Sequence, residues 1–219
     1  MTNDLPQGSA EWDALHPYAS LTPDAVLDAL ADIGLMGDGR LIALSSYENR
    51  VYQIQLETER APAQTDGTPV PESVVAKFYR PGRWTDAQIQ EEHDFAAELV
   101  AAEVPVVPPL NLQGRTLHHK SFVKGVNSSA AHKANLAEPQ KTVQGFSFSV
   151  SERRGGRRPE LDDDEVLEWI GRFLARIHTV GAAKAFHNRP SLSIDTFMQE
   201  PKEWLLHNKA IPLEVERAW

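Results

Sequence analysis

The hydrophobic pattern of this chain changes between its first and second parts, and this change limits the folds that it can adopt. Residues 40–47, 50–57 and 73–80 alternate apolar and polar side chains with the period of a half-buried β-strand. After residue 162 the apolar side chains recur at helical spacing instead. Runs of strands followed by runs of helices predict an α+β fold with an antiparallel sheet and a mostly helical second part.

Two helix-start signals frame these strands. Thr22 is a good N-cap, Pro23 suits the first helical position, and Gly34 can close the helix that they begin. Thr85 and Gln88 have the spacing of a capping box at the start of a longer helix, TDAQIQEEHDFAAELVAAE. We therefore expect one helix before the strands and a long one directly after the third strand.

Two further strands are expected around residues 115–119 and 145–151, which makes a five-stranded sheet. Between them, residues 120–144 are rich in Ser, Ala, Asn and Lys and show no periodicity. A connection this long inside a compact domain is uncommon, so we expect a mobile surface insertion. The predicted divisions are an N-terminal arm (1–20), a lobe that contains the sheet (21–152) and the start of a helical lobe (153–219).

Composition excludes several classes of protein. The 219-residue chain carries a net charge of −9, so its surface should repel phosphate, and neither a nucleic acid nor an anionic membrane is an expected partner. It has no cysteine, which rules out disulfides, thiolate nucleophiles and cysteine metal sites. No apolar run approaches the ~18 residues of a membrane span, and the N-terminus lacks the character of a signal peptide. A cytoplasmic protein is the simplest interpretation.

Lys77 lies in the middle of the expected strand SVVAKFYR, on the same face as Val75 and Tyr79. An ammonium group there must reach solvent, as on an ordinary edge strand, or find an anionic partner. Glu92 falls on the apolar stripe of the following helix with Ile89, so its carboxylate lies on the face expected to be buried. Together the two residues predict a strand-to-helix ion pair, the arrangement with which protein kinases hold a lysine against the phosphates of ATP.

The turn between the first two strands is polar and contains no glycine. In a kinase this turn covers the nucleotide phosphates. Ser46 and Asn49 can donate hydrogen bonds there, and Arg50 could supply positive charge. An ordinary polar β-turn remains the alternative.

These segments resemble the stress response kinase A family, bacterial serine/threonine protein kinases within the aminoglycoside phosphotransferase and choline kinase group. The resemblance covers most of residues 21–219 outside the insertion. It implies a bilobal protein-kinase-like fold, ATP- and Mg²⁺-dependent phosphorylation of an unknown protein substrate, a role in the stress response, and a monomeric, cytoplasmic protein. The stretches that carry it are SSYENRVYQ, VVAKFYRPGRWTDAQIQEEHDFAAELV, EVPVVPPL, GFSFSVSERRGGR and IGRFLARIHTVGA.

The resemblance also implies roles for individual residues. Lys77 matches the nucleotide-anchoring lysine, Glu92 the glutamate that orients it, and Ser46 a phosphate-loop serine that contacts ATP. Residues 148–152 match the hinge whose backbone meets the adenine, although the family has Phe-Pro where this chain has Ser-Glu after the hinge valine. With the turn residues included, the predicted ATP-binding set is Ser46, Asn49, Arg50, Lys77, Glu92, Val150, Ser151 and Glu152.

The family's catalytic loop, His-Gly-Asp-x-His-x-x-Asn, and its metal-binding Asp-Leu-Asp-Asp occur nowhere in the sequence. His178 is interpreted as a structural residue at a helix end, and residues 162–164 as helix-start charges. We therefore expect a fragment of a longer kinase, inactive as given. Its catalytic aspartate is expected beyond Trp219, and no catalytic or metal-binding residue is assigned within the chain.

Two other functions remain open. A small-molecule kinase of the same fold, acting on an aminoglycoside, choline or homoserine-type acceptor, differs mainly in the helical lobe. A catalytically inactive nucleotide-binding module would bind ATP without transferring phosphate. Nucleic-acid binding through the RRGGRR stretch at 153–158 carries little weight in an acidic chain.

Overall fold

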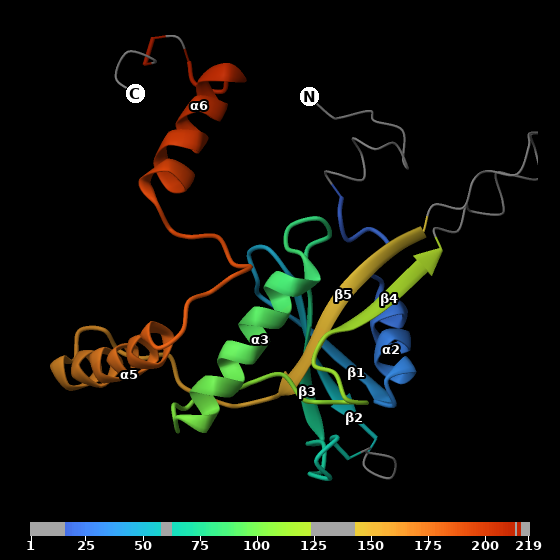
Figure 1. Ribbon diagram of the computed structural model, residues 1–219. Coiled ribbons are helices and arrows are strands. Elements are labelled where there is room, and N and C mark those ends of the chain that lie inside the picture. The colour runs from blue at the N-terminus through green and yellow to red at the C-terminus, as the bar shows by residue number, and fades with distance from the viewer. Residues whose placement is uncertain (1–15, 58–62, 124–142, 213, 216–219) are drawn as a thin grey trace, which may run out of the picture. The chain divides into compact units, whose positions relative to one another are not determined.

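The computed structural model describes residues 16–57, 63–123, 143–212 and 214–215 (Figure 1). By its internal contacts the chain divides into two compact units, Met1–Ala185 and Phe186–Trp219. The lobes proposed from the sequence, 21–152 and 153–219, stay a prediction.

The first unit is built on a five-stranded antiparallel sheet, as the sequence predicts (Figure 1). The strand order is β1-β2-β3-β5-β4, so the last strand of the chain lies between the third and the fourth. Consecutive strands pair in antiparallel register from β1 to β3, and β5 pairs with both β3 and β4. The strands are β1 (Gly37–Leu44), β2 (Arg50–Leu56), β3 (Ser73–Phe78), β4 (His118–Val123) and β5 (Val143–Glu152).

Helix α2 (Pro23–Asp32) and helix α3 (Asp86–Ala101) begin where the sequence predicts. Thr22 caps α2 by accepting a hydrogen bond from the N–H of Ala25. Both hydrogen bonds of the capping box at Thr85 and Gln88 are present at the start of α3. Local sequence therefore determines where both helices start.

Helix α5 (Asp164–Ala182) follows the sheet and contacts the end of α3. Its N-cap is Asp163, one residue after the predicted start at Asp162, because the Asp163 carboxylate accepts from the N–H groups of Glu165 and Val166. Arg176 donates to the carbonyl of Glu103 at 2.7 Å, just beyond the last turn of α3, and so joins the two helices.

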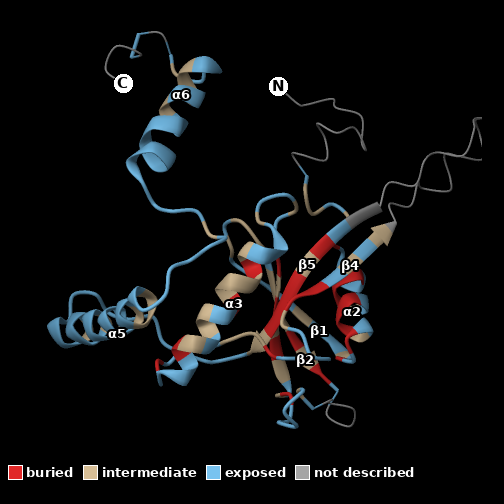
Figure 2. Ribbon diagram, in the orientation of Figure 1, coloured by how far each residue is buried: buried red, intermediate tan, exposed pale blue. Residues whose placement is uncertain are grey.

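The main core lies between α2 and one face of the sheet. Figure 2 shows the buried residues gathered in α2 and in the central strands. The rings of Phe78 and Phe148, on neighbouring strands, stack with centroids 5.0 Å apart. Fully buried side chains from the helix and strands include Val26, Leu30, Ile54, Val74, Phe78, Phe146, Phe148 and Val150.

The two last strands differ from their predicted limits. β4 begins at His118 and β5 at Val143, so residues 120–123 and 143–144 of the predicted insertion belong to strands, while residues 124–142 lie outside the described residues. The inward positions of β4 carry His118 and Lys120, which pair in register with Phe148 and Phe146. The His118 ring packs against Phe148 in a tilted arrangement, with centroids 5.5 Å apart, and Lys120 forms an ion pair with Asp32 of α2. Polar residues on the inner face hid this strand from a pattern based on hydrophobicity.

The second unit contains a π-helical turn, η2 (Asp195–Gln199), continued by α6 (Glu200–His207). None of its described residues is buried. In the described part of the chain, no helix combines the length and apolar character needed to cross a bilayer.

Candidate functional site

The predicted ion pair between β3 and α3 is present. The Lys77 Nζ lies 2.9 Å from Glu92 Oε1. About a third of each side chain remains exposed, 32% for Lys77 and 39% for Glu92. A partly exposed pair contributes at most about 1 kcal/mol to folding. Its main effect is therefore to fix the position of an accessible ammonium group.

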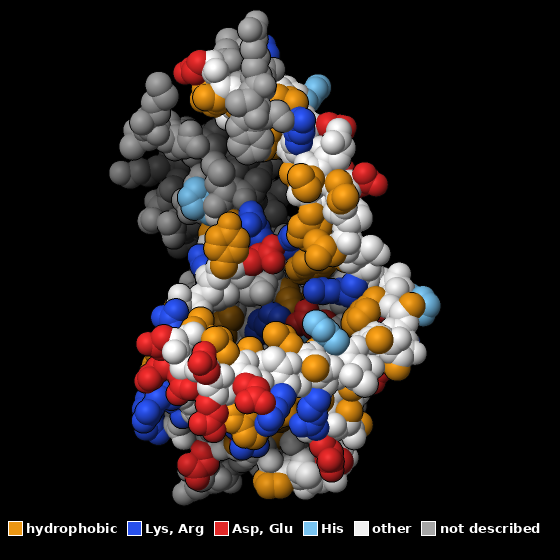
Figure 3. Space-filling model, turned by 90° about the vertical axis from the view of Figure 1, so that its left-hand side faces the viewer, with side chains coloured by type: hydrophobic (Ala, Val, Ile, Leu, Met, Phe, Trp, Pro, Cys, Tyr) orange, Lys and Arg blue, Asp and Glu red, His pale blue; other side chains and the backbone are white. Residues whose placement is uncertain are grey.

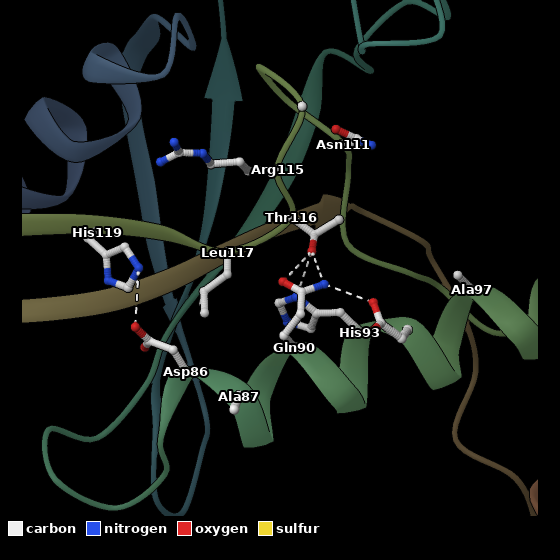
Figure 4. A pocket seen from close by; sticks show the side chains of 12 residues that line it. Asp86, Ala87, Gln90, His93, Ala97, Asn111, Arg115, Thr116, Leu117 and His119 are labelled. Atoms are coloured by element: carbon white, nitrogen blue, oxygen red, sulfur yellow. Dashed lines mark hydrogen bonds and ion pairs between the residues drawn. The ribbon is translucent and has the colours of Figure 1, made fainter. Parts of the chain in front are cut away.

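A buried polar network lies next to this pair, and Figure 4 shows the part of it that joins His93 to Thr116. The Tyr79 ring packs against Lys77, with Nζ 4.6 Å from the ring centroid. The Tyr79 hydroxyl is 2.8 Å from Nε2 of His93 and 3.2 Å from the hydroxyl of Ser149. On its other side, Nδ1 of His93 is 2.9 Å from the Thr116 hydroxyl. These bonds fix α3 against the sheet at the turn that carries Glu92.

Sequence reasoning missed His93 and Thr116. His93 lies one helical turn after the buried Ile89, so its position on the inner face of α3 could have been inferred from spacing. Burial lowers the pKa of His93 and raises that of Tyr79, so both side chains are uncharged at neutral pH. Thr116 comes from the irregular segment before β4, where the sequence gives no comparable indication.

The face of the sheet around Lys77 is partly apolar. In the register, Lys77 stands between Val51 of β2 and Ser149 of β5. Residues directly opposite each other share a face, and β3 alternation adds Val75 to this set. Val51 and Val75 are half-buried. An exposed cation next to two accessible valines can hold a ligand that has both an anionic and a flat apolar part.

The turn at residues 45–49 is held in place by several contacts. The Tyr18 hydroxyl donates to the carbonyl of Glu48 at 2.8 Å, and Arg83 Nε donates to the Glu48 carboxylate at 2.6 Å. Asn49 Oδ1 accepts the N–H of Arg80 at 3.3 Å. Ser46 is half-buried within the turn. Asn49 thus orders the turn, and its proposed contact with ATP, like that of Ser46, stays a prediction.

The structure does not bring Arg50 together with Lys77. Arg50 pairs with Phe78, whose side chain lies in the core on the α2 side, whereas Val51 pairs with Lys77. The Arg50 guanidinium stacks on the Tyr18 ring, 4.8 Å from its centroid. Strand alternation turns the Arg50 side chain to the face opposite Lys77, and its contact with ATP stays a prediction.

The hinge residues lie at the end of β5. Val150 is buried in the core, and its carbonyl accepts from the N–H of Leu110 at 2.7 Å. Ser151 pairs with Val75, and the Glu152 carboxylate is bound by Arg154 at 2.7 Å. The chain leaves the sheet only after Glu152. Contacts of Val150, Ser151 and Glu152 with adenine stay a prediction.

A hollow of about 640 Å³ lies on the outer side of the network, between α3 and residues 111–119 (Figure 4). Gln90, His93 and Thr116 line it, and His119 faces Asp86 at 3.5 Å across one end. Within the described ranges, no group of three or more His, Asp or Glu side chains could hold a metal ion.

Comparison with known proteins agrees with this geometry. The model of the phosphotransferase enzyme family matches residues 40–214. Stress response kinase A of Escherichia coli (strain K12) is 36% identical over 202 residues, which cover 92% of this chain and 51% of the relative. Serine/threonine protein kinase RdoA of Salmonella typhimurium is 37% identical over 191 residues, 87% of this chain and 48% of the relative. The chain thus spans about half the length of these curated relatives.

Two solved structures share the fold. Amicoumacin kinase hAmiN, in complex with AMP-PNP, Ca²⁺ and Ami, superposes with a TM-score of 0.52 at 16% identity, covering 85% of this chain and 51% of that one. A microcompartment-associated aminopropanol kinase gives a TM-score of 0.51 at 17% identity, covering 83% and 49%. The kinase-like fold and the resemblance to stress response kinase A are confirmed, and the chain belongs to the phosphotransferase enzyme family.

Proposed function

We propose that the chain is the nucleotide-binding half of an ATP-dependent protein kinase that acts on serine or threonine and serves a stress response. The observation that carries the proposal is the pair of Lys77 and Glu92, 2.9 Å apart and partly exposed on the face of the sheet against which α3 packs. In protein kinases a strand lysine and a helix glutamate in this arrangement orient the phosphates of ATP.

The residues around the pair fit ATP. The Lys77 ammonium supplies the charge that the phosphates require, and Glu92 and Tyr79 restrict where it can lie. Val51 and Val75 offer an apolar surface for the adenine on the same face. We expect the turn at residues 45–49 to cover the phosphates, with the Ser46 side chain directed toward them.

Transfer of the γ-phosphoryl group needs Mg²⁺ and a group that orients the acceptor hydroxyl. We propose that these groups belong to the half of the relatives' length that this chain does not span. The chain's own residues then have one role, to bind the nucleotide and fix its phosphates.

A protein acceptor is favoured over a small molecule by the relatives, since one at 37% identity is named a serine/threonine protein kinase. The small-molecule kinases among the solved structures share only the fold at 16–17% identity. The protein acceptor is therefore the finer part of the proposal and needs a separate test.

Binding of a non-hydrolysable ATP analogue, measured by calorimetry, tests the site. We expect Lys77→Ala to weaken binding at least about tenfold and Glu92→Gln by about threefold or more, because each removes an interaction that places charge at the phosphates. Lys184→Ala is the matched control, since Lys184 also pairs with an α3 carboxylate, Glu98, at 2.9 Å but lies away from the sheet face. Its binding should equal that of the wild type.

A folded wild-type chain that binds no nucleotide would refute the proposal, and so would equal losses in Lys77→Ala and Lys184→Ala. Phosphate transfer is measured in a longer protein that contains this chain and has the full length of its relatives. Labelled serine or threonine in a protein acceptor supports the kinase proposed here. Transfer only to an amino alcohol, aminoglycoside or similar acceptor contradicts it, as does nucleotide binding with no transfer.

A further inference from the structure

A second hollow, of about 590 Å³, lies on the face of the sheet opposite Lys77. It is bordered by residues 16–21 ahead of α2, by the turn before β2, and by Tyr52 and Arg80. Neither Lys77 nor Glu92 contributes to it. The two sites therefore share the turn at residues 45–49 but use opposite faces.

Two guanidinium groups line this hollow. Arg50 stacks on Tyr18, and Arg80 contributes its backbone N–H to the turn. Within the described part of the chain, neither forms an ion pair with a carboxylate. Glu48, the acidic residue of the lining, is already bound by Arg83 at 2.6 Å. The hollow thus holds two cations whose charge is not neutralised by a neighbouring carboxylate.

The charges of both guanidiniums act on the Tyr18 hydroxyl. Burial raises the pKa of Tyr18 to about 12, and the nearby charges of Arg50 and Arg80 both oppose that rise. The hydroxyls of Tyr47 and Tyr52 also belong to the lining, and neither has a hydrogen-bond partner within the described ranges. The available groups are therefore two guanidinium cations and two neutral hydroxyls, all of which can donate hydrogen bonds.

Such a set selects for a particular ligand. Guanidinium groups bind phosphate through paired N–H donors, and tyrosine hydroxyls can donate to the remaining oxygens. Two nearby cations favour a dianion over a single carboxylate. The overall negative charge of the chain does not prevent this, because salt screens charges more than about 8 Å away.

We infer that this hollow is a binding site for a phosphate monoester, formed by Arg50, Arg80 and Tyr52. The group can come from a phosphorylated side chain of a protein or from a small phosphorylated metabolite. Arg50 is the first residue of β2 and stacks on Tyr18, whose hydroxyl donates to the carbonyl of Glu48. A phosphate bound by Arg50 therefore immobilises the turn at residues 45–49 from the face opposite Lys77. If the proposed nucleotide site is correct, phosphate binding here tightens ATP binding, and ATP tightens phosphate binding equally.

Calorimetry and NMR titration of the 219-residue chain test the site in low-salt buffer free of phosphate. The probes are inorganic phosphate, a phosphoserine peptide and the same peptide with unmodified serine. We expect inorganic phosphate and the phosphoserine peptide to bind, and the unmodified peptide not to bind. Arg80→Gln should weaken binding at least about tenfold, and Arg50→Lys by about threefold or more, because it keeps the charge but loses the paired donors.

Arg172→Gln is the matched control, because it removes the same charge from the exposed face of α5, where Arg172 pairs with Glu168. Arg80 is exposed, so its variant should fold even if changes at Arg50 disturb the packing of Tyr18. Equal binding in Arg80→Gln and Arg172→Gln would overturn the inference, as would a wild-type chain that binds neither phosphorylated probe.

The two phosphorylated probes distinguish the sources. Tighter binding of the phosphoserine peptide than of inorganic phosphate supports a protein ligand, and equal binding supports a small metabolite.

Failure of the proposed nucleotide site would give a different set of binding results. Phosphate binding would then persist in Lys77→Ala and would be unchanged by the ATP analogue, and only the coupling between the two sites would be lost.

Discussion

Two histidines in the sheet unit make stability depend on pH. His118 is only 6% exposed, and its Nε2 has no hydrogen-bond partner within the described part of the chain. Burial, reinforced by the charge of neighbouring His119, lowers its pKa from 6.5 to about 4. Burial also lowers the pKa of His93. Both rings are neutral in the folded state and must gain a proton when the chain unfolds in acid.

The unfolded chain binds more protons than the folded one below pH 6.5, so stability is complete above that value and falls as the pH decreases toward 4. For His118 alone the loss between pH 7 and pH 5 is about 2 kcal/mol. Urea unfolding at the two pH values measures it.

His118→Phe provides the decisive comparison, because Phe can keep the ring contact with Phe148 but cannot be protonated. We expect its loss of stability between pH 7 and pH 5 to be clearly smaller than that of the wild type. His178→Gln on the exposed surface of α5 serves as the control and should keep the full dependence. A variant at position 118 that lost as much stability as the wild type would disprove the role of this ring.

Which site residues the sequence could identify depends on how local their partners are. Lys77 and Glu92 were found because alternation and helical spacing place each on a defined face, only 15 residues apart. Thr116 was missed because it meets His93 through tertiary packing, from a segment without periodicity. Only the register of β2 with β3 shows that Arg50 lies on the face of the sheet opposite Lys77.

Helix α3 carries both Glu92 and His93, so its start matters for the site. Thr85→Ala removes one half of the capping box, and we expect it to lower the free energy of unfolding by about 1 kcal/mol. Thermal or urea unfolding followed by circular dichroism measures this change. Thr179→Ala, in the interior of α5, is the control and should change stability by less than about 0.5 kcal/mol.

An equal change in both variants would show that the cap contributes nothing specific.

The limits of the elements show the same contrast between local and distant causes. Capped helices were predicted almost to the residue, since the capping groups are neighbours in sequence. Strand β4 begins three residues and ends four residues later than predicted, because the phenylalanines that cover its polar inner face belong to β5.

At the level of the complete chain, α5 has apolar side chains that nothing described covers. Figure 3 shows hydrophobic side chains exposed among acidic and basic ones on the face drawn there. Leu167, Trp169 and Leu174 are each about half exposed, although α5 has the strong apolar stripe of a packed helix. Exposed apolar surface of this kind binds hydrophobic dyes and promotes self-association.

We expect the double variant Trp169→Gln, Leu174→Gln to reduce the fluorescence of a bound hydrophobic dye at least about twofold without lowering the melting temperature. Leu192→Gln, at an exposed leucine outside the helix, should leave the signal nearly unchanged. Unchanged dye binding in the double variant would mean that this surface of α5 is not accessible in solution.

The sheet, the long helix and the family could all be recognised from the sequence, because repeated short patterns define them. The acceptor could not, and the chain spans only about half the length of the relatives that it matches. The second hollow was also beyond prediction, since its lining combines residues before α2 with the starts and ends of two strands.

The position of β5 has a consequence for how the protein is made on the ribosome. β3 and β4 are separated in the sheet by a strand that is translated after both. From Phe78 to Val143 the ribosome adds 65 residues, which takes about 3 to 13 s at ordinary rates of elongation. During that time the nascent chain exposes an unpaired strand edge, so that chaperones that bind emerging polypeptides have a defined interval in which to prevent misassembly.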